Sequence, residues 1–229
     1  MINAAITSGG YFLVLNMTEK HLEILDKKRK EILPLFKDFK DRFYLAAGTG
    51  LALQLGHRDS IDFDFFTNKV FNPEDLLREI REIFNGYSIE VIQASNKTLN
   101  LVVADEIKVS FFCIKENLLR PCLDFGVFNI ADPMDIACMK ICALLRAEFK
   151  DYVDLYYIFK KTSLKEIIEN CKKKYTSFDA AVYLKALVSF DDINYTEILF
   201  TKGNKVALPV IKKDFEKRVK GYLLETSSI

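Results

Sequence analysis

Several residue types are scarce in this 229-residue chain, and each scarcity excludes a class of protein. The two histidines, His21 and His57, are too few for a His-rich metal centre. The five cysteines are an odd number and form no C-x-x-C pair, so neither a disulfide framework nor a cysteine-based zinc site is expected. Unpaired cysteines are typical of the cytoplasm, which is where we expect the protein to act. No apolar run approaches the roughly 18 residues of a membrane span, so no membrane partner is expected.

An excess of charge of either sign is also missing. The chain carries 33 Lys+Arg against 32 Asp+Glu, so its overall charge predicts no polyanionic partner. Half of the residues are apolar and 28% are charged, which is typical of a globular protein. Residues 201–220 are a local exception, with seven basic against two acidic side chains. This stretch could contact RNA phosphates or form an ordinary solvated helix face.

The order of the expected elements predicts the fold class. Strand-like runs lie between about residues 60 and 130, and helical patterns dominate afterwards. We therefore expect an α+β fold, in which a small mixed β-sheet with flanking helices precedes a helical C-terminal part. Met17 could be a second start, so residues 1–16 are interpreted as an N-terminal extension. The boundaries that follow are 17–131 for the core and 132–229 for the helical part.

Local signals place the individual elements. Pro34 is expected to break or kink the first helix. Asn72-Pro73 and Gly86 are start and stop signals for a helix, and Ser163 with Glu166 matches a capping box. The expected helices are 18–39, 48–56 after a turn, 73–86, and nearly everything from 133 onward, including 178–190 and 208–224. The expected strands are 61–66, 87–94, 98–104, 107–114 and 125–130.

Two acids on one expected strand are the most informative feature. Asp62 and Asp64 are two residues apart, so on a strand both side chains point to the same face, while Ile61, Phe63 and Phe65 point to the core. Neighbouring carboxylates repel each other unless a cation lies between them, and such oxygen ligands suit Mg²⁺. The alternative is a solvent-exposed edge strand with two ordinary acids.

The segment before these acids favours the metal site. Gly48-Thr49-Gly50 lies between an apolar run and a helix. Glycine permits close backbone approach, and amides at the start of a helix can hold phosphate oxygens. A phosphate-binding turn followed by a metal-binding acid pair is a coherent triphosphate site.

Here the sequence resembles the DNA polymerase β-like nucleotidyltransferase superfamily, in which a Gly-Ser/Thr turn precedes a helix and then an Asp-x-Asp strand. It looks closer still to the AbiEii/AbiGii-type toxins of that superfamily. Ala47 replaces the first glycine of the toxin pattern. The positions that match the pattern are Gly48, Thr49, His57, Arg58, Ser60, Asp62 and Asp64.

A second motif downstream extends the resemblance. It consists of a lysine and an arginine on an apolar helix, followed by Lys-Asp-x-x-Asp-Leu. In such families the lysine, here Lys140, binds nucleotide phosphates and the acids support the site. Asp151 and Asp154 could instead cap a helix start and pair with Arg146 or Arg58. The matching positions are Lys140, Arg146, Lys150, Asp151, Asp154 and Leu155.

The resemblance implies a metal-dependent nucleotidyltransferase that moves an NMP group from an NTP to an acceptor. It further implies the toxin component of a bacterial toxin–antitoxin or abortive-infection system, with a cognate antitoxin and RNA, especially tRNA, as a plausible acceptor. Mg²⁺ or Mn²⁺ would be held by Asp62 and Asp64. The NTP would contact Gly48, Thr49, Arg58 and Lys140. Arg58 could alternatively pair with Asp59, and His57 is expected to bond the loop backbone.

One departure concerns the general base. Related enzymes place a third carboxylate on a following strand, where this chain has Ser110. A serine cannot act as general base unaided. Either the acceptor loses its proton to solvent, or Asp154 supplies the carboxylate, or the site is catalytically weak. Two other functions therefore stay open, a catalytically retired nucleotide-binding module and a small-molecule nucleotidyltransferase.

Overall fold

The computed structural model describes residues 20–227, so the interpretation of residues 1–16 lies outside the described part. A seven-stranded mixed sheet forms the centre, with strand order β3-β4-β5-β2-β1-β7-β6. The pairs β2–β5 and β1–β7 are parallel and the other neighbours are antiparallel. The strands are β1 Tyr44–Leu45, β2 Phe63–Thr67, β3 Ile89–Ser95, β4 Thr98–Val103, β5 Ile107–Cys113, β6 Leu123–Asp124 and β7 Asn129–Ile130.

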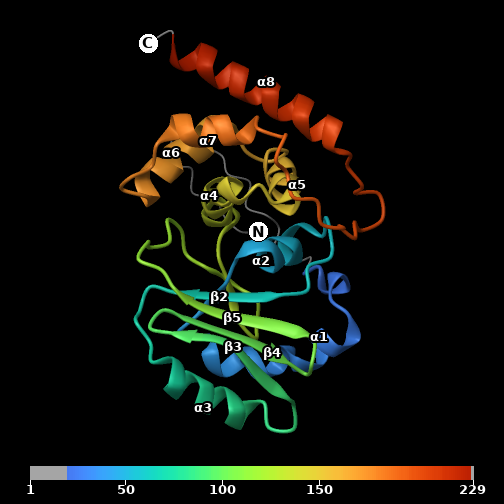
Figure 1. The fold of residues 1–229 in the computed structure, drawn as a ribbon, viewed down its shortest axis with the longest axis vertical. Helices are drawn as coiled ribbons and strands as arrows, with labels where there is room; N and C mark the ends of the chain where they lie inside the picture. Colours follow the sequence, from blue (N-terminus) through green and yellow to red (C-terminus); the bar gives the residue numbers. More distant parts are fainter. Residues whose placement is uncertain (1–19, 228–229) are drawn as a thin grey trace, which may run out of the picture.

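Helices lie on both sides of this sheet, which confirms the predicted α+β class (Figure 1). In this view α3 lies below the strands, α1 lies beside their right-hand end, α2, α4 and α5 lie above them, and α8 is the outermost helix at the top. No helix of residues 20–227 is both long and apolar enough to cross a membrane. The α-helices are α1 Lys27–Ile32, α2 Ala47–Leu55, α3 Pro73–Ile83, α4 Pro133–Ala143, α5 Phe149–Ile158, α6 Leu164–Lys174, α7 Ala180–Leu187 and α8 Leu208–Thr226.

One face of the sheet, on which Phe36 packs, is covered by phenylalanines. The ring of Phe36 lies within 4.8–5.0 Å of Phe63 and Phe65, and the ring of Phe111 lies 5.3 Å from Phe65. All four side chains are at most 1% exposed. Because side chains alternate along a strand, this packing turns Asp64 to the opposite face. The core therefore fixes which face of β2 carries the acids.

Several predicted elements are confirmed with small shifts. The Asn72 side chain accepts from the amides of Glu74 and Asp75 at the start of α3, and Ser163 accepts from the Glu166 amide at the start of α6. Strands β3, β4 and β5 and the hairpin turn at Asp105 also form as expected.

Other expectations are wrong. The helix expected over 18–39 is three pieces in its described part. The break near Pro34 is the expected one, because Pro34 lacks the amide proton that α1 would need to continue, whereas the break before α1, which Asp26 caps, was not expected. The expected strand 125–130 is a turn with Gly126 at φ 93°, and only Asn129–Ile130 pairs as a strand. Ile61 precedes β2 and is 53% exposed, so it does not reach the core. Residues 188–207 form no helix.

We predict that two Gly→Ala substitutions have opposite effects on stability. Gly56 ends α2 at φ +59°, and a Cβ there would meet the His21 ring, so Gly56→Ala should lower the free energy of unfolding by about 1–2 kcal/mol or more. Gly221→Ala within α8 is the matched control, since nothing lies within 4 Å of its Cβ position. It should stabilise by about 0.5–1 kcal/mol. Urea denaturation measures both changes, and equal effects would contradict the prediction.

Candidate active site

A cleft of about 860 Å³ lies above the open face of the sheet. Its walls come from the start of α2, the turn before β2, the ends of β2 and β5, helices α4 and α5, and residues 196–199. The predicted site residues that line it are Gly48, Arg58, Asp62, Asp64 and Lys140. Thr49 and Asp154, also predicted, are not among the described residues that line it.

The two acids share this cleft and influence each other. Burial raises the pKa of the Asp64 carboxyl, and the neighbouring charge of Asp62 raises it further. A hydrogen bond with Ser110, directly across on β5, partly offsets these effects, as do the charges of Lys140 and Lys150. Two acids that repel each other in this way provide oxygen ligands for a cation.

The first turn of α2 approaches these acids closely. The amide of Ala46 donates to the backbone carbonyl of Asp64 over 3.1 Å. A Cβ at Gly48 would lie 2.7 Å from Arg58 Nη2, so this position needs glycine for the guanidinium to fit. Ala47 has φ +53°, a left-handed conformation that glycine adopts more readily. The alanine therefore follows the backbone path expected for the glycine it replaces.

The Thr49 side chain is turned away from the cleft. It is 1% exposed, and its hydroxyl bonds to the Ser60 hydroxyl at 2.8 Å and donates to the backbone carbonyl of Asp62. These bonds tie α2 to the turn that enters β2. Thr49 thus holds the backbone of Asp62 in place.

Asp154 is the centre of a buried ionic cluster. Arg58 reaches it with Nε at 2.7 Å and Nη2 at 2.9 Å, and Lys140 Nζ reaches its second oxygen at 2.6 Å. His57 Nε2 lies 2.8 Å away. Burial alone would raise the pKa of Asp154, but the Arg58 and Lys140 charges and the hydrogen bonds from His57 and Arg58 hold it well below its usual range. A carboxylate held so firmly ionised is a poor proton acceptor.

Asp151 extends the cluster by one helical turn. It bonds Lys140 at 2.7 Å and Arg146 at 3.0 Å. Lys140 is 4% exposed and bonds both acids of α5 from helix α4. The salt-bridge alternative weighed for Asp151 and Asp154 is therefore what the side chains form. Arg58 and Lys140 each keep a place in the cleft wall.

A non-local strand-like contact supports the turn that carries Arg58. Phe200 forms an antiparallel bridge with Arg58, and the Asp59 amide donates to the Leu199 carbonyl at 2.8 Å. Asn204 and Thr201 bond the Gly56 carbonyl. Local sequence patterns could not predict this contact, because Thr201 and Gly56 are 145 residues apart in the chain. His57, expected to bond the loop backbone with its side chain, instead bonds Asp154.

Three tyrosines of α5 lie close to Asp154 in sequence, but Tyr152, Tyr156 and Tyr157 are not among the described cleft-lining residues. Tyr152 instead bonds the carbonyls of Ala186 and Ser189. Much of the basic stretch is on α8, which contacts α5, α6 and α7. Sequence reasoning missed Lys97 and Glu197, which line the cleft from a turn and from the irregular segment.

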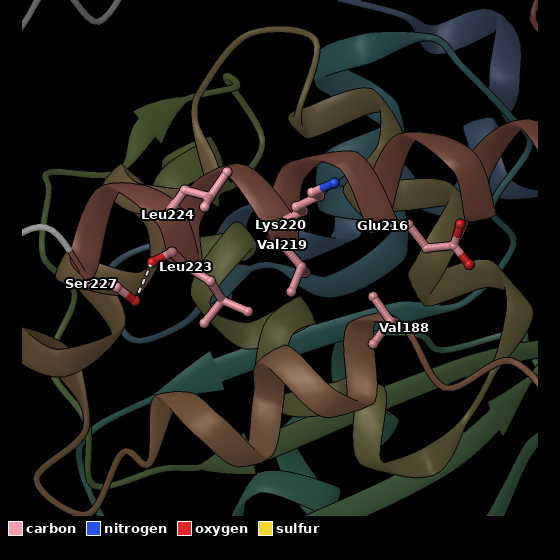
Figure 2. Close-up of a pocket in the computed structure, with 7 residues that line it drawn as sticks. All are labelled: Val188, Glu216, Val219, Lys220, Leu223, Leu224 and Ser227. Carbon is pink, nitrogen blue, oxygen red and sulfur yellow. Dashed lines mark hydrogen bonds between the residues drawn. The ribbon is translucent and has the colours of Figure 1, made fainter.

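A second cavity of about 490 Å³ lies between the end of α7 and the C-terminal half of α8 (Figure 2). Its lining is mainly aliphatic, from Val188, Val219, Leu223 and Leu224, with Glu216 and Lys220 as its charged groups. It has no pair of acids, so it lacks the chemistry of the larger cleft.

The fold resembles solved structures from Helicobacter pylori. JHP933 matches with a TM-score of 0.52 and 18% identity, covering 90% of this chain and all of that one. A structure named as a candidate nucleotidyltransferase matches with a TM-score of 0.54 and 17% identity, covering 86% of this chain and 95% of that one. At these identities the matches show that the fold is shared with these structures.

Sequence comparison makes the assignment more specific. The family model for the nucleotidyl transferase AbiEii toxin of type IV toxin–antitoxin systems matches residues 35–228. The chain belongs to this family and is a nucleotidyltransferase. A relative from Aquifex aeolicus (strain VF5), uncharacterized protein aq_aa25, is 36% identical over 192 residues, covering 79% of this chain and 88% of that protein.

We predict that Asp154→Asn is strongly destabilising. It would leave the buried cations Arg58 and Lys140 without their shared counter-charge, at a cost of about 3 kcal/mol or more in the free energy of unfolding. Asp214→Asn, which removes a half-exposed pair with Arg218 on α8, is the control and should cost about 1 kcal/mol or less. Urea denaturation compares the two, and similar losses would contradict a central role for Asp154.

Stability should also fall on acidification. Burial lowers the pKa of His57 below its unfolded value of about 6.5, despite its bond to Asp154. As the pH falls below about 6.5, the unfolded chain binds a proton that the folded chain does not, so the free energy of unfolding decreases. His57→Gln should flatten this dependence between about pH 7 and 5, measured by urea denaturation at each pH. An unchanged slope would show that His57 is not the group responsible.

Asp154 should destabilise the protein in a more acidic range. Its folded pKa is also lowered, so its contribution to the free energy of unfolding should be lost below about pH 4.

Proposed function

We propose that this nucleotidyltransferase moves an NMP group from an NTP to an acceptor hydroxyl with the help of a divalent metal. One observation carries the proposal. Asp62 and Asp64 line the same cleft as Arg58 and Lys140. In this proposal the two acids bind a cation and the two basic side chains bind phosphate. The reaction forms a bond from the acceptor oxygen to the α-phosphorus and breaks the bond to the β-phosphate, so pyrophosphate leaves.

The acid pair fits a divalent metal. The repulsion that raises the pKa of Asp64 is relieved by a cation, and both donors are hard oxygens. Among residues 20–227 no group of three or more acidic, His or Cys side chains could hold a metal, so further ligands would come from the NTP and water. Mg²⁺, or Mn²⁺, bound there would neutralise charge on the transferring phosphoryl group.

The chain's own groups would position the triphosphate. Gly48 leaves room for the Arg58 guanidinium beside the start of α2, and the amides of the first turn of α2 favour an anion. Arg58 and Lys140 are fixed in the wall by Asp154 and Asp151, so they can meet phosphate oxygens without reorganising. Thr49, predicted to contact the NTP, contributes through its bond to Asp62.

For Asp154, which the sequence offers as a source of the missing third carboxylate, the contacts favour a positioning role. It acts through Arg58 and Lys140 rather than on the acceptor proton. The proton of the acceptor hydroxyl would then pass to water or to an acid at the cleft, such as Asp59 or Glu197. Ser110 accordingly does not need to replace a general base, because positioning and charge neutralisation provide most of phosphoryl-transfer catalysis.

Family membership supports the biological setting that we propose. The protein would act in the cytoplasm as the toxin of a toxin–antitoxin or abortive-infection system, together with a cognate antitoxin. RNA, tRNA in particular, is the acceptor we favour. Lys97, Arg146 and Lys150 line the cleft and could contact RNA phosphates beyond the reacting hydroxyl.

We predict that Asp62→Asn and Asp64→Asn each abolish transfer, with losses of at least about a thousandfold, because neither variant keeps both acids of the metal pair. The assay incubates the protein with each labelled NTP, Mg²⁺ and total RNA, and follows label in RNA. Asp41→Asn is the matched control, since Asp41 is exposed and lies outside the cleft. Full activity in either variant would contradict the proposal, and NTP binding without transfer would favour a retired module.

A further inference from the structure

One end of the cleft differs from the rest in having an aromatic floor. Phe66 on β2 and Phe112 on β5 are directly paired in the sheet, with ring centroids 5.2 Å apart and planes tilted by 32°. Both line the cleft. They follow Asp64 and Ser110, the preceding pair on the same face, so the floor begins about 7 Å along the strands from the acids.

Helix α4 contributes a further part of the cleft wall. Met139, Cys142 and Ala143 are three and four residues apart, so they share one side of the helix, and all three line the cleft. They are half-buried, whereas Cys138 and Ile141 on the other sides of α4 are fully buried. Met139 adds a polarisable sulfur, which makes favourable contacts with aromatic rings.

These five side chains, Phe66, Phe112, Met139, Cys142 and Ala143, bound what we call the base slot. It is uncharged, although it continues directly into a region of acids and cations. Its walls suit a flat, largely apolar group that is joined to a polyanion by a short linker. A nucleoside triphosphate has this construction, since the ribose separates the base from the phosphates.

We propose that the base slot binds the base of the incoming NTP by stacking on Phe112 and Phe66. The inference rests on the proposed function, because it assumes that the triphosphate lies at Asp62, Asp64, Arg58 and Lys140. Stacking on aromatic rings tolerates every base, so the slot provides affinity with little discrimination among the four NTPs. Thr98 at the cleft margin is the nearby hydroxyl that could contact the edge of the base.

The test separates the base from the phosphates. Binding of ATP and of inorganic tripolyphosphate, each with Mg²⁺, is measured by titration calorimetry for the wild type and Phe112→Leu. The variant keeps apolar volume but loses the ring, so ATP affinity should fall about fivefold or more while tripolyphosphate affinity stays unchanged. Phe71→Leu is the matched control, because Phe71 is a half-buried ring that packs on Phe43 outside the cleft. It should change neither affinity.

Each other outcome contradicts a specific claim. Unchanged ATP affinity in Phe112→Leu, with the wild type binding both ligands, would overturn the base slot alone. Equal losses for ATP and tripolyphosphate would also overturn it, because the effect would not depend on the base. A wild-type protein that binds neither ligand would instead overturn the proposed function together with the slot.

A measurement on the unmodified protein covers the case in which Phe112→Leu does not fold. Cys142 lines the slot, whereas Cys122 is a half-buried thiol outside the cleft, and burial raises the pKa of both. With Mg²⁺ present, ATP should slow alkylation of Cys142 at least about threefold relative to tripolyphosphate, while Cys122 reacts equally with either ligand. Equal alkylation of Cys142 in the two conditions would overturn the proposal.

Discussion

The buried carboxylate of Asp154 is the constraint on which the active-site geometry depends. A fully buried acid is costly unless its charge is compensated. Here Arg58, just before β2, and Lys140, on α4, compensate the charge of Asp154, and His57, just after α2, adds a hydrogen bond. Because all these bonds meet at one group, the turn before β2 and the helices α4 and α5 are fixed relative to one another. The cleft is the space that this arrangement leaves above the sheet.

The same bonds explain how cations and acids coexist at short range. Arg58 and Lys140 are held on one side by α5, while Asp62 and Asp64 are held on the other by the sheet and by the bond from Thr49. A site organised in this way before substrate arrives needs little rearrangement during phosphoryl transfer. In the proposed reaction Asp154 would therefore act through Arg58 and Lys140, although it does not line the cleft.

Local features of the fold were predictable and long-range ones were not. The acids Asp62, just before β2, and Asp64, on β2, and the caps of α3 and α6 depend on residues within a few positions, so alternation and capping signals identify them. The break of the first helix before α1 depends on the N-cap Asp26, which the apolar spacing of residues 18–39 does not indicate. The Thr49 hydroxyl bonds the Asp62 carbonyl instead of facing the cleft, and Phe200 pairs with Arg58. Both contacts depend on partners that only the folded chain brings together. The base slot likewise combines β2, β5 and α4, whose phenylalanines look like ordinary core residues in sequence.

The central claim is that the Asp154 cluster holds Arg58 and Lys140 ready for a triphosphate opposite the two acids. A crystal structure with Mg²⁺ and a non-hydrolysable NTP analogue tests it most directly. The account predicts metal between Asp62 and Asp64, phosphate oxygens at Arg58 and Lys140, and Asp154 still bonded to both cations. A triphosphate bound elsewhere, or cations released from Asp154 to reach it, would contradict the account.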